Sequence, residues 1–143
     1  MQTKAYAVLY YHFVWKTWEG EPLIREALQR PLFRCIEGEV ERLGGTVMAL
    51  GGTANHIHLV VQLPTQVSPS RLMQQVKGVS AQFGRDFLGD DELFRWQHGY
   101  GVFTLSRPHL KKAIAYTNNQ REHHDCQQLW SEWEQSEIVM ASS

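Results

Sequence analysis

The segment from His56 to Leu63, His-Ile-His-Leu-Val-Val-Gln-Leu, is the feature that most constrains the fold. It has the length and the aliphatic content of one β-strand, and Pro64 ends it. A turn of small and polar residues, 51–55, precedes it, and a shorter apolar segment, 46–50, precedes the turn. Two strands linked this closely predict an antiparallel hairpin.

The rest of the chain alternates between strand and helix patterns. Apolar residues at helical spacing predict that Leu72, Val76, Val79, Phe83 and Phe87 form the buried side of one helix. We predict strands over residues 5–16, 46–50 and 56–63, strand pieces over 94–96 and 100–105, helices over 31–43, 68–88 and 106–124, and a short helix within 128–139.

This order predicts an α+β fold. A ferredoxin-like or RRM-like antiparallel sheet of four to five strands would have its helices packed mainly on one face, with a C-terminal helix added. The 143 residues fit one domain, 1–143, and the 43% hydrophobic content allows a core.

Charge, cysteine spacing and the lack of long apolar runs argue against a general nucleic-acid coat protein, a cysteine metal or redox site and a membrane protein. A net charge of −1 opposes a protein that coats nucleic acid non-specifically, although it allows a local basic groove. Cys35 and Cys126 have no metal or redox spacing, so free thiols are expected. The chain shows neither a signal-peptide pattern nor a membrane-spanning run, which predicts a cytoplasmic protein.

His56 and His58 are the first candidate site residues. Side chains two apart on a strand share a face, so both imidazoles point the same way while Ile57 points into the core. Histidine is the commonest protein metal ligand, but the pattern alone more often marks a polar strand face. A closed structural zinc site is not expected, because no further strong ligands stand at suitable spacing.

Tyr116 and Gln120 share one face of the last predicted helix, and His123 and His124 lie one turn further along that side. A helical tyrosine usually serves packing. The polar residues around Tyr116 suit an exposed functional hydroxyl better than a core anchor.

Four blocks in order resemble the single-tyrosine HUH transposases of small bacterial insertion sequences. They cover almost the whole chain: Tyr-His-Phe-Val-Trp at 11–15, Asn-His-Ile-His-Leu-Val at 55–60, Trp-Gln-His-Gly-Tyr-Gly-Val-Phe at 96–103, and the Tyr-x-x-x-Gln-x-x-His-His pattern at 116–124. A Ser-Pro-started helix, Ser68-Pro69, lies between the second and third blocks. The branch of REP-associated tyrosine transposases is equally compatible.

The resemblance implies an enzyme that cuts and rejoins single-stranded DNA near hairpins. Tyr116 would attack a backbone phosphate and form a 5′-phosphotyrosine. His56, His58 and the carbonyl oxygen of Gln120 would hold Mg²⁺ or Mn²⁺, with His123 or His124 as the less favoured third ligand. The family also implies a homodimer, in which the two chains can share an active site.

The DNA contacts are open to more than one interpretation. Lys77, Arg85, Lys111 and Lys112 are the candidate nucleic-acid-binding residues, and a solvated helix face is as good an interpretation for each. Tyr10, Trp18, Trp96 and Tyr100 could stack on bases, although core packing is favoured. No role is assigned to His12, His98 or His109.

Two other functions compete with the transposase. The first is a domesticated regulator that binds a DNA or RNA hairpin without cutting it. The second is a ferredoxin-like small-ligand or regulatory domain, in which the two histidines are surface residues. The presence of Tyr116 together with His56 and His58 favours the enzyme over the non-cleaving regulator.

Overall fold

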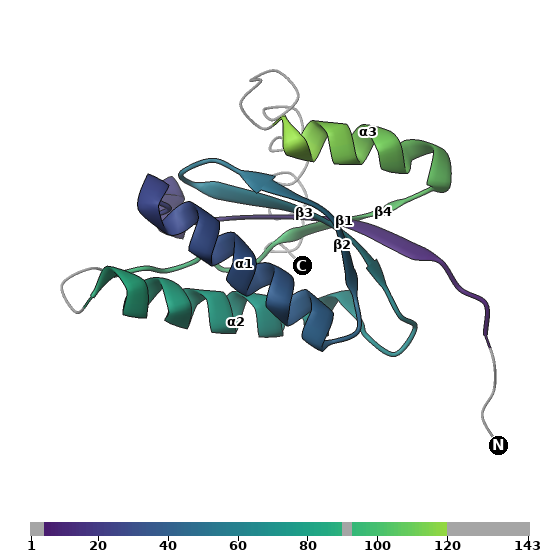
Figure 1. Ribbon diagram of the computed structural model, residues 1–143, viewed down its shortest axis with the longest axis horizontal. Coiled ribbons are helices and arrows are strands. Elements are labelled where there is room, and N and C mark those ends of the chain that lie inside the picture. The colour runs from purple at the N-terminus through teal and green to yellow at the C-terminus, as the bar shows by residue number, and fades with distance from the viewer. Residues whose placement is uncertain (1–4, 90–92, 120–143) are drawn as a thin grey trace, which may run out of the picture.

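A computed structural model describes residues 5–89 and 93–119. Within them four strands form one antiparallel sheet in the order β2-β3-β1-β4 (Figure 1). The elements are β1 (Leu9–Lys16), the short 3-10 helix η1 (Trp18–Gly20), α1 (Glu26–Arg42), β2 (Thr46–Gly52), β3 (His56–Leu63), α2 (Pro69–Leu88), β4 (Gly101–Leu105) and α3 (Arg107–Asn118).

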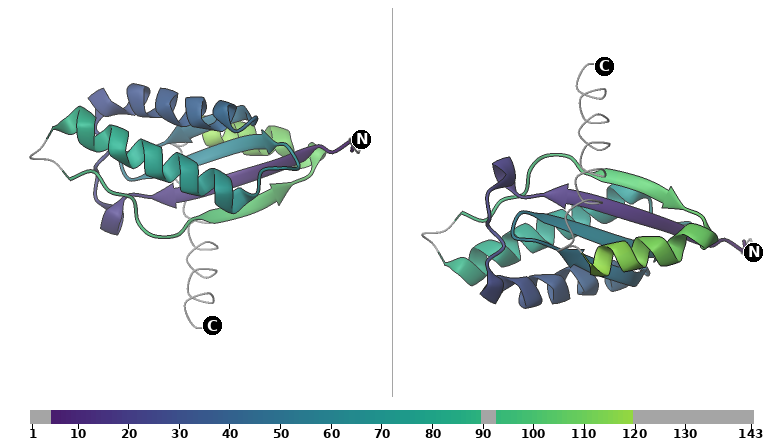
Figure 2. Two further views of the ribbon diagram at one scale, coloured as in Figure 1. Left: turned by 90° about the horizontal axis from the view of Figure 1, so that it is seen from below. Right: turned by 90° about the horizontal axis from the view of Figure 1, so that it is seen from above.

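The molecule has three layers. Helices α1 and α2 pack side by side on one face of the sheet, and α3 crosses the other face (Figures 1 and 2). The sequence-based prediction of a ferredoxin-like α+β fold is therefore confirmed, with four strands and one helix added after β4.

The pairing of β1 with β3 decides which side chains face which layer. Trp15 pairs with Ile57, and both are fully buried in the core beneath α1 and α2. Val14 pairs with His58, so this pair points to the other face, toward α3. Helices on both sides explain why β3 is buried along almost its whole length.

The buried side of α2 differs from the prediction. Leu72 and Val76 are fully buried as predicted, but Val79 is 36% exposed and Phe87 is 45% exposed, while Phe83 packs at the margin of the core. The segment after α2 returns along the helix, and its side chains Trp96 and Phe94 pack against the small residues Ser80 and Gly84. The additional buried residues of α2 are Met73, Ser80 and Gly84.

Gly84 offers a direct test of this packing. A Cβ at position 84 would lie 2.5 Å from the ring of Phe94, whereas a Cβ at Gly78, on the same helix, would meet nothing within 4 Å. We expect Gly84→Ala to destabilise the protein by about 1–3 kcal/mol, because the buried ring must shift. Gly78→Ala should stabilise it by roughly 0.5–1 kcal/mol through helix propensity. Urea unfolding of both variants measures the two effects, and equal effects would contradict the packing of Phe94.

Several predicted boundaries also shift. Helix α1 begins at Glu26, so Pro31 lies inside it and not in its first turn. Burial of Leu28 beside Leu32 explains the earlier start. The first strand starts at Leu9, and the predicted strand piece over 94–96 is a single bridge between Trp96 and Thr17.

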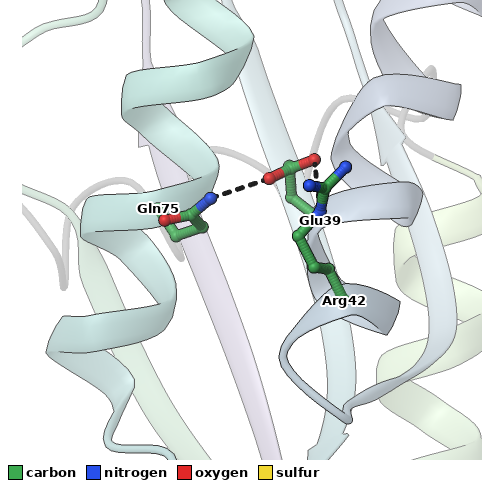
Figure 3. Close-up of polar contacts among 3 residues, drawn as sticks. All are labelled: Glu39, Arg42 and Gln75. Carbon is green, nitrogen blue, oxygen red and sulfur yellow. Dashed lines mark hydrogen bonds and ion pairs between the residues drawn. The ribbon is translucent and has the colours of Figure 1, made fainter.

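One buried carboxylate, that of Glu39, links helices α1 and α2 (Figure 3). Glu39 of α1 accepts a hydrogen bond of 2.8 Å from Nε2 of Gln75 in α2, and its other oxygen lies 3.5 Å from Nε of Arg42. These contacts satisfy a charged group that is only 6% exposed. Burial, with the nearby Glu39 carboxylate, also raises the pKa of the Cys35 thiol.

Cys35 is a free thiol, as expected, and Cys126 lies outside the described residues. None of the helices in the described part of the chain combines the length and the apolar character needed to cross a membrane.

Candidate active site

His56 and His58 lie side by side on the face of β3 that α3 covers. Their ring centroids are 5.2 Å apart, and the rings stand nearly perpendicular to each other. Their exposed fractions are only 6% and 1%, while Ile57 between them points into the opposite core. The histidines therefore share a face as predicted, but they are not the surface residues that a simple ligand-binding domain would show.

The turn before β3 fixes the orientation of His56. Its Nδ1 lies 2.9 Å from Oδ1 of Asn55 and 2.8 Å from Oγ1 of Thr53. The Asn55 amide nitrogen donates to the carbonyl oxygen of Gly20, so Oδ1 is the atom that faces His56. His56 then donates from Nδ1, which leaves the lone pair on Nε2. A side chain at Gly52 would overlap the carbonyl oxygen of His56, which requires glycine at this turn.

His58 is held from the neighbouring strand. Its Nδ1 lies 2.9 Å from Nε2 of His12 in β1. Its Nε2 is buried and has no hydrogen-bond partner among the described residues. Burial, reinforced by His12 and His56, lowers the pKa of His58 to about 2, and burial lowers the pKa of His12 to about 4. Both imidazoles are therefore neutral at pH 7, the form in which histidine binds metals.

Helix α3 brings Tyr116 to the histidines. Its ring centroid lies 5.4 Å from that of His58 and 6.0 Å from that of His12, both in edge-on geometry. The neighbouring Thr117 and Ala113 are buried against the sheet and anchor the helix. The hydroxyl of Tyr116 is buried, which corrects the prediction of an exposed hydroxyl. Of the polar residues that follow Tyr116, Asn118 and Asn119 are exposed, whereas Thr117 is buried against the sheet.

The histidine pair fits a metal with an incomplete set of protein ligands. Both His56 and His58 have Nδ1 engaged by a neighbour, and the buried Nε2 of His58 is left for a cation. No three His, Cys, Asp or Glu side chains within 5–89 and 93–119 are placed to hold one ion. The predicted third ligand, Gln120, and its alternatives, His123 and His124, lie outside the described residues.

The predicted DNA-binding residues fall on opposite sides of the sheet. Lys111 and Lys112 are exposed on α3, in the layer that carries Tyr116. Lys77 and Arg85 belong to α2, in the opposite layer. Lys77 donates to the carbonyl oxygens of Gln97 and Gly99, and Arg85 donates to that of Phe94. These hydrogen bonds stabilise the segment before β4.

The aromatic candidates have mainly packing roles. Trp96 belongs to the core and donates from Nε1 to Oγ of Ser80, and Tyr100 packs against the same core. Trp18 lies partly exposed beneath the guanidinium of Arg95, at 3.9 Å from the ring centroid.

Sequence reasoning missed the contributions of His12, Thr53 and Asn55. A histidine among the apolar residues of the predicted first strand was a usable signal. Its partner could not be identified without the pairing of β1 with β3, whose hydrogen-bonded residues are far apart in the sequence.

The chain resembles a known protein family and two solved structures. The sequence profile of the family described as "Transposase IS200 like" matches residues 5–120. No curated protein matches the chain. A crystal structure from Deinococcus radiodurans R1, described as a candidate transposase, aligns with a TM-score of 0.65 and 21% identity, over 84% of this chain and 97% of that one. A REP-associated tyrosine transposase bound to a REP hairpin aligns with a TM-score of 0.60 and 13% identity, over 82% of this chain and 70% of that one. The two structures share the fold, and the profile match over most of the chain shows that it belongs to the family of IS200-like transposases.

Proposed function

We propose that this transposase cleaves and rejoins single-stranded DNA near hairpins, with Tyr116 as nucleophile and a divalent metal at His56 and His58. The observation that carries the proposal is the contact between Tyr116 and His58. The buried hydroxyl of Tyr116 lies near the neutral imidazole of His58, whose buried Nε2 has no hydrogen-bond partner within residues 5–89 and 93–119. A packing role alone would not account for two histidines, His12 and His58, against one tyrosine, with His56 beside His58, in a region this buried.

The proposed reaction is a transesterification. Oη of Tyr116 forms a bond to the scissile phosphorus while the bond from phosphorus to the 3′ oxygen breaks. The phenolic proton is lost, and the leaving oxygen takes up a proton to become a 3′-hydroxyl. The energy of the broken ester is retained in the 5′-phosphotyrosine, so a 3′-hydroxyl can reverse the step and reseal a strand without a nucleotide cofactor.

Nε2 of His56 and of His58 would hold the metal, and we propose the carbonyl oxygen of Gln120 as third ligand. Bound Mg²⁺ or Mn²⁺ would supply charge stabilisation and orientation to the phosphoryl group. Imidazole ligands suit Mn²⁺ better than Mg²⁺, so we expect stronger binding of Mn²⁺.

The proposal is tested with labelled single-stranded hairpin DNA that carries the repeats flanking the gene. The wild-type protein should form an adduct that survives denaturation with Mn²⁺ or Mg²⁺ and not with EDTA. Hairpin binding without any adduct would favour the non-cleaving regulator instead.

The exposed side of α3 is the proposed surface for the DNA backbone. Lys111→Glu and Lys112→Glu should each weaken hairpin binding and reduce the slope of log affinity against log salt by about 0.7 per lost phosphate contact. Arg34→Glu is the matched control, because it makes the same charge change on the exposed side of α1, in the opposite layer. Fluorescence anisotropy over a salt series measures the slopes. If all three variants changed hairpin affinity and salt slope equally, α3 would not be the surface that binds the DNA backbone.

We also propose a homodimer. One chain by itself brings Tyr116 to His58, which supports a site assembled within each subunit. Analytical sedimentation measures the oligomeric state of the protein. A monomer that still cleaves DNA would contradict the proposed homodimer.

A further inference from the structure

His12 forms a deeply buried polar contact that the proposed reaction does not use. Its Nε2 lies 2.9 Å from Nδ1 of His58, and the exposed fractions of the two residues are 5% and 1%. In the strand register His12 pairs with Val60 and His58 pairs with Val14, so the two histidines are diagonal neighbours on one face. Their geometry is therefore set by the strand pairing itself.

This hydrogen bond has two possible directions with opposite consequences. A neutral imidazole carries a proton on one nitrogen and a lone pair on the other. If Nδ1 of His58 donates to His12, the lone pair of His58 is on Nε2, the buried atom that has no hydrogen-bond partner in the described part of the chain. If His12 donates instead, Nε2 of His58 carries the proton and cannot bind a cation.

We propose that His12 is a positioning residue that accepts the proton of Nδ1 of His58 and thereby directs the Nε2 lone pair of His58 toward the metal. The inference deepens the proposed function and rests on the metal site at His56 and His58. His56 has the same arrangement, because its Nδ1 donates to Oδ1 of Asn55. Each proposed ligand thus has an acceptor behind it, and an acceptor of this kind fixes both tautomer and ring orientation.

Two substitutions separate hydrogen bonding from packing. His12→Phe keeps a ring in the space but removes the acceptor. His12→Gln places an amide oxygen near the position of Nε2, where it can accept the same proton. Titration with Mn²⁺ in the absence of DNA should show an affinity about 10- to 100-fold weaker for His12→Phe. The affinity of His12→Gln should lie close to that of the wild type.

A second measurement needs neither DNA nor metal. Long-range proton–nitrogen NMR of the metal-free protein reports which nitrogen of each histidine carries the proton. Wild type should show His58 protonated at Nδ1, and His12→Phe should shift His58 toward the form protonated at Nε2. Because the wild-type spectrum alone gives the direction of the bond, the inference stays testable even if His12→Phe does not fold.

Several outcomes would overturn the inference. They are a wild-type His58 protonated at Nε2, an unchanged Mn²⁺ affinity in His12→Phe, and an equal loss of affinity in both variants, which would indicate a purely structural role. Failure of the proposed function looks different. In that case the wild-type protein itself would bind no Mn²⁺ while its His58 tautomer remained as expected, and His12 would orient a residue that holds no metal.

Discussion

Tyr116→Phe should abolish the covalent adduct with DNA while leaving hairpin binding intact. The substitution removes only the hydroxyl, so the edge-on contacts of the ring with His58 and His12 remain. Without the nucleophile, cleavage should fall by on the order of 10⁴-fold or more. Denaturing gels with labelled DNA measure the adduct, and anisotropy measures binding.

Tyr100→Phe is the matched control for this variant. Tyr100 is a half-buried tyrosine that packs on the opposite side of the sheet, with its ring 6.2 Å from that of Phe13. It should retain adduct formation. If Tyr116→Phe still formed the adduct, the nucleophile would have to be another residue.

His58→Ala should have the second largest effect. It removes a proposed metal ligand, so the loss of Mn²⁺ affinity should exceed the roughly 10- to 100-fold typical of residues that only orient a ligand. Cleavage should fall with it, and a higher Mn²⁺ concentration should restore part of the rate. Calorimetric titration with Mn²⁺ and the adduct assay give the two readouts.

His98→Ala is the control for the loss of an imidazole. His98 is exposed and contacts only the edge of Trp18 among the described aromatic rings. This variant should bind Mn²⁺ and cleave like the wild type. Full cleavage by His58→Ala in the presence of EDTA would refute a metal site at this residue.

The sequence predicts the fold well because local patterns determine most of it. The hairpin of residues 46–63 and the helix that begins after Ser68 are where the pattern places them, and the Ser68 side chain caps that helix by accepting from the Arg71 backbone. The inner face of α2 was predicted poorly. Val79 and Phe87 have the spacing of a buried helix face, yet both are exposed. The buried face instead includes Gly84, which packs against the ring of Phe94, a residue from a later segment of the chain.

The candidate site was predictable only in part, for a similar reason. The strand period places His56 and His58 on one face, and the helix-borne Tyr116 was identified through the family resemblance. The role of His12 depends on the register between β1 and β3, and the burial of the Tyr116 hydroxyl depends on where α3 crosses the sheet. Neither can be deduced from local patterns in the sequence.

The central claim is that Tyr116 becomes covalently attached to DNA, and peptide mapping of the adduct tests it most directly. The wild-type protein is incubated with single-stranded hairpin DNA and Mn²⁺, digested with a protease and a nuclease, and analysed by mass spectrometry. The account predicts that the peptide containing Tyr116 carries a nucleotide through a phosphotyrosine bond. A nucleotide on any other residue, or no modified peptide from DNA that has been cut, would contradict it.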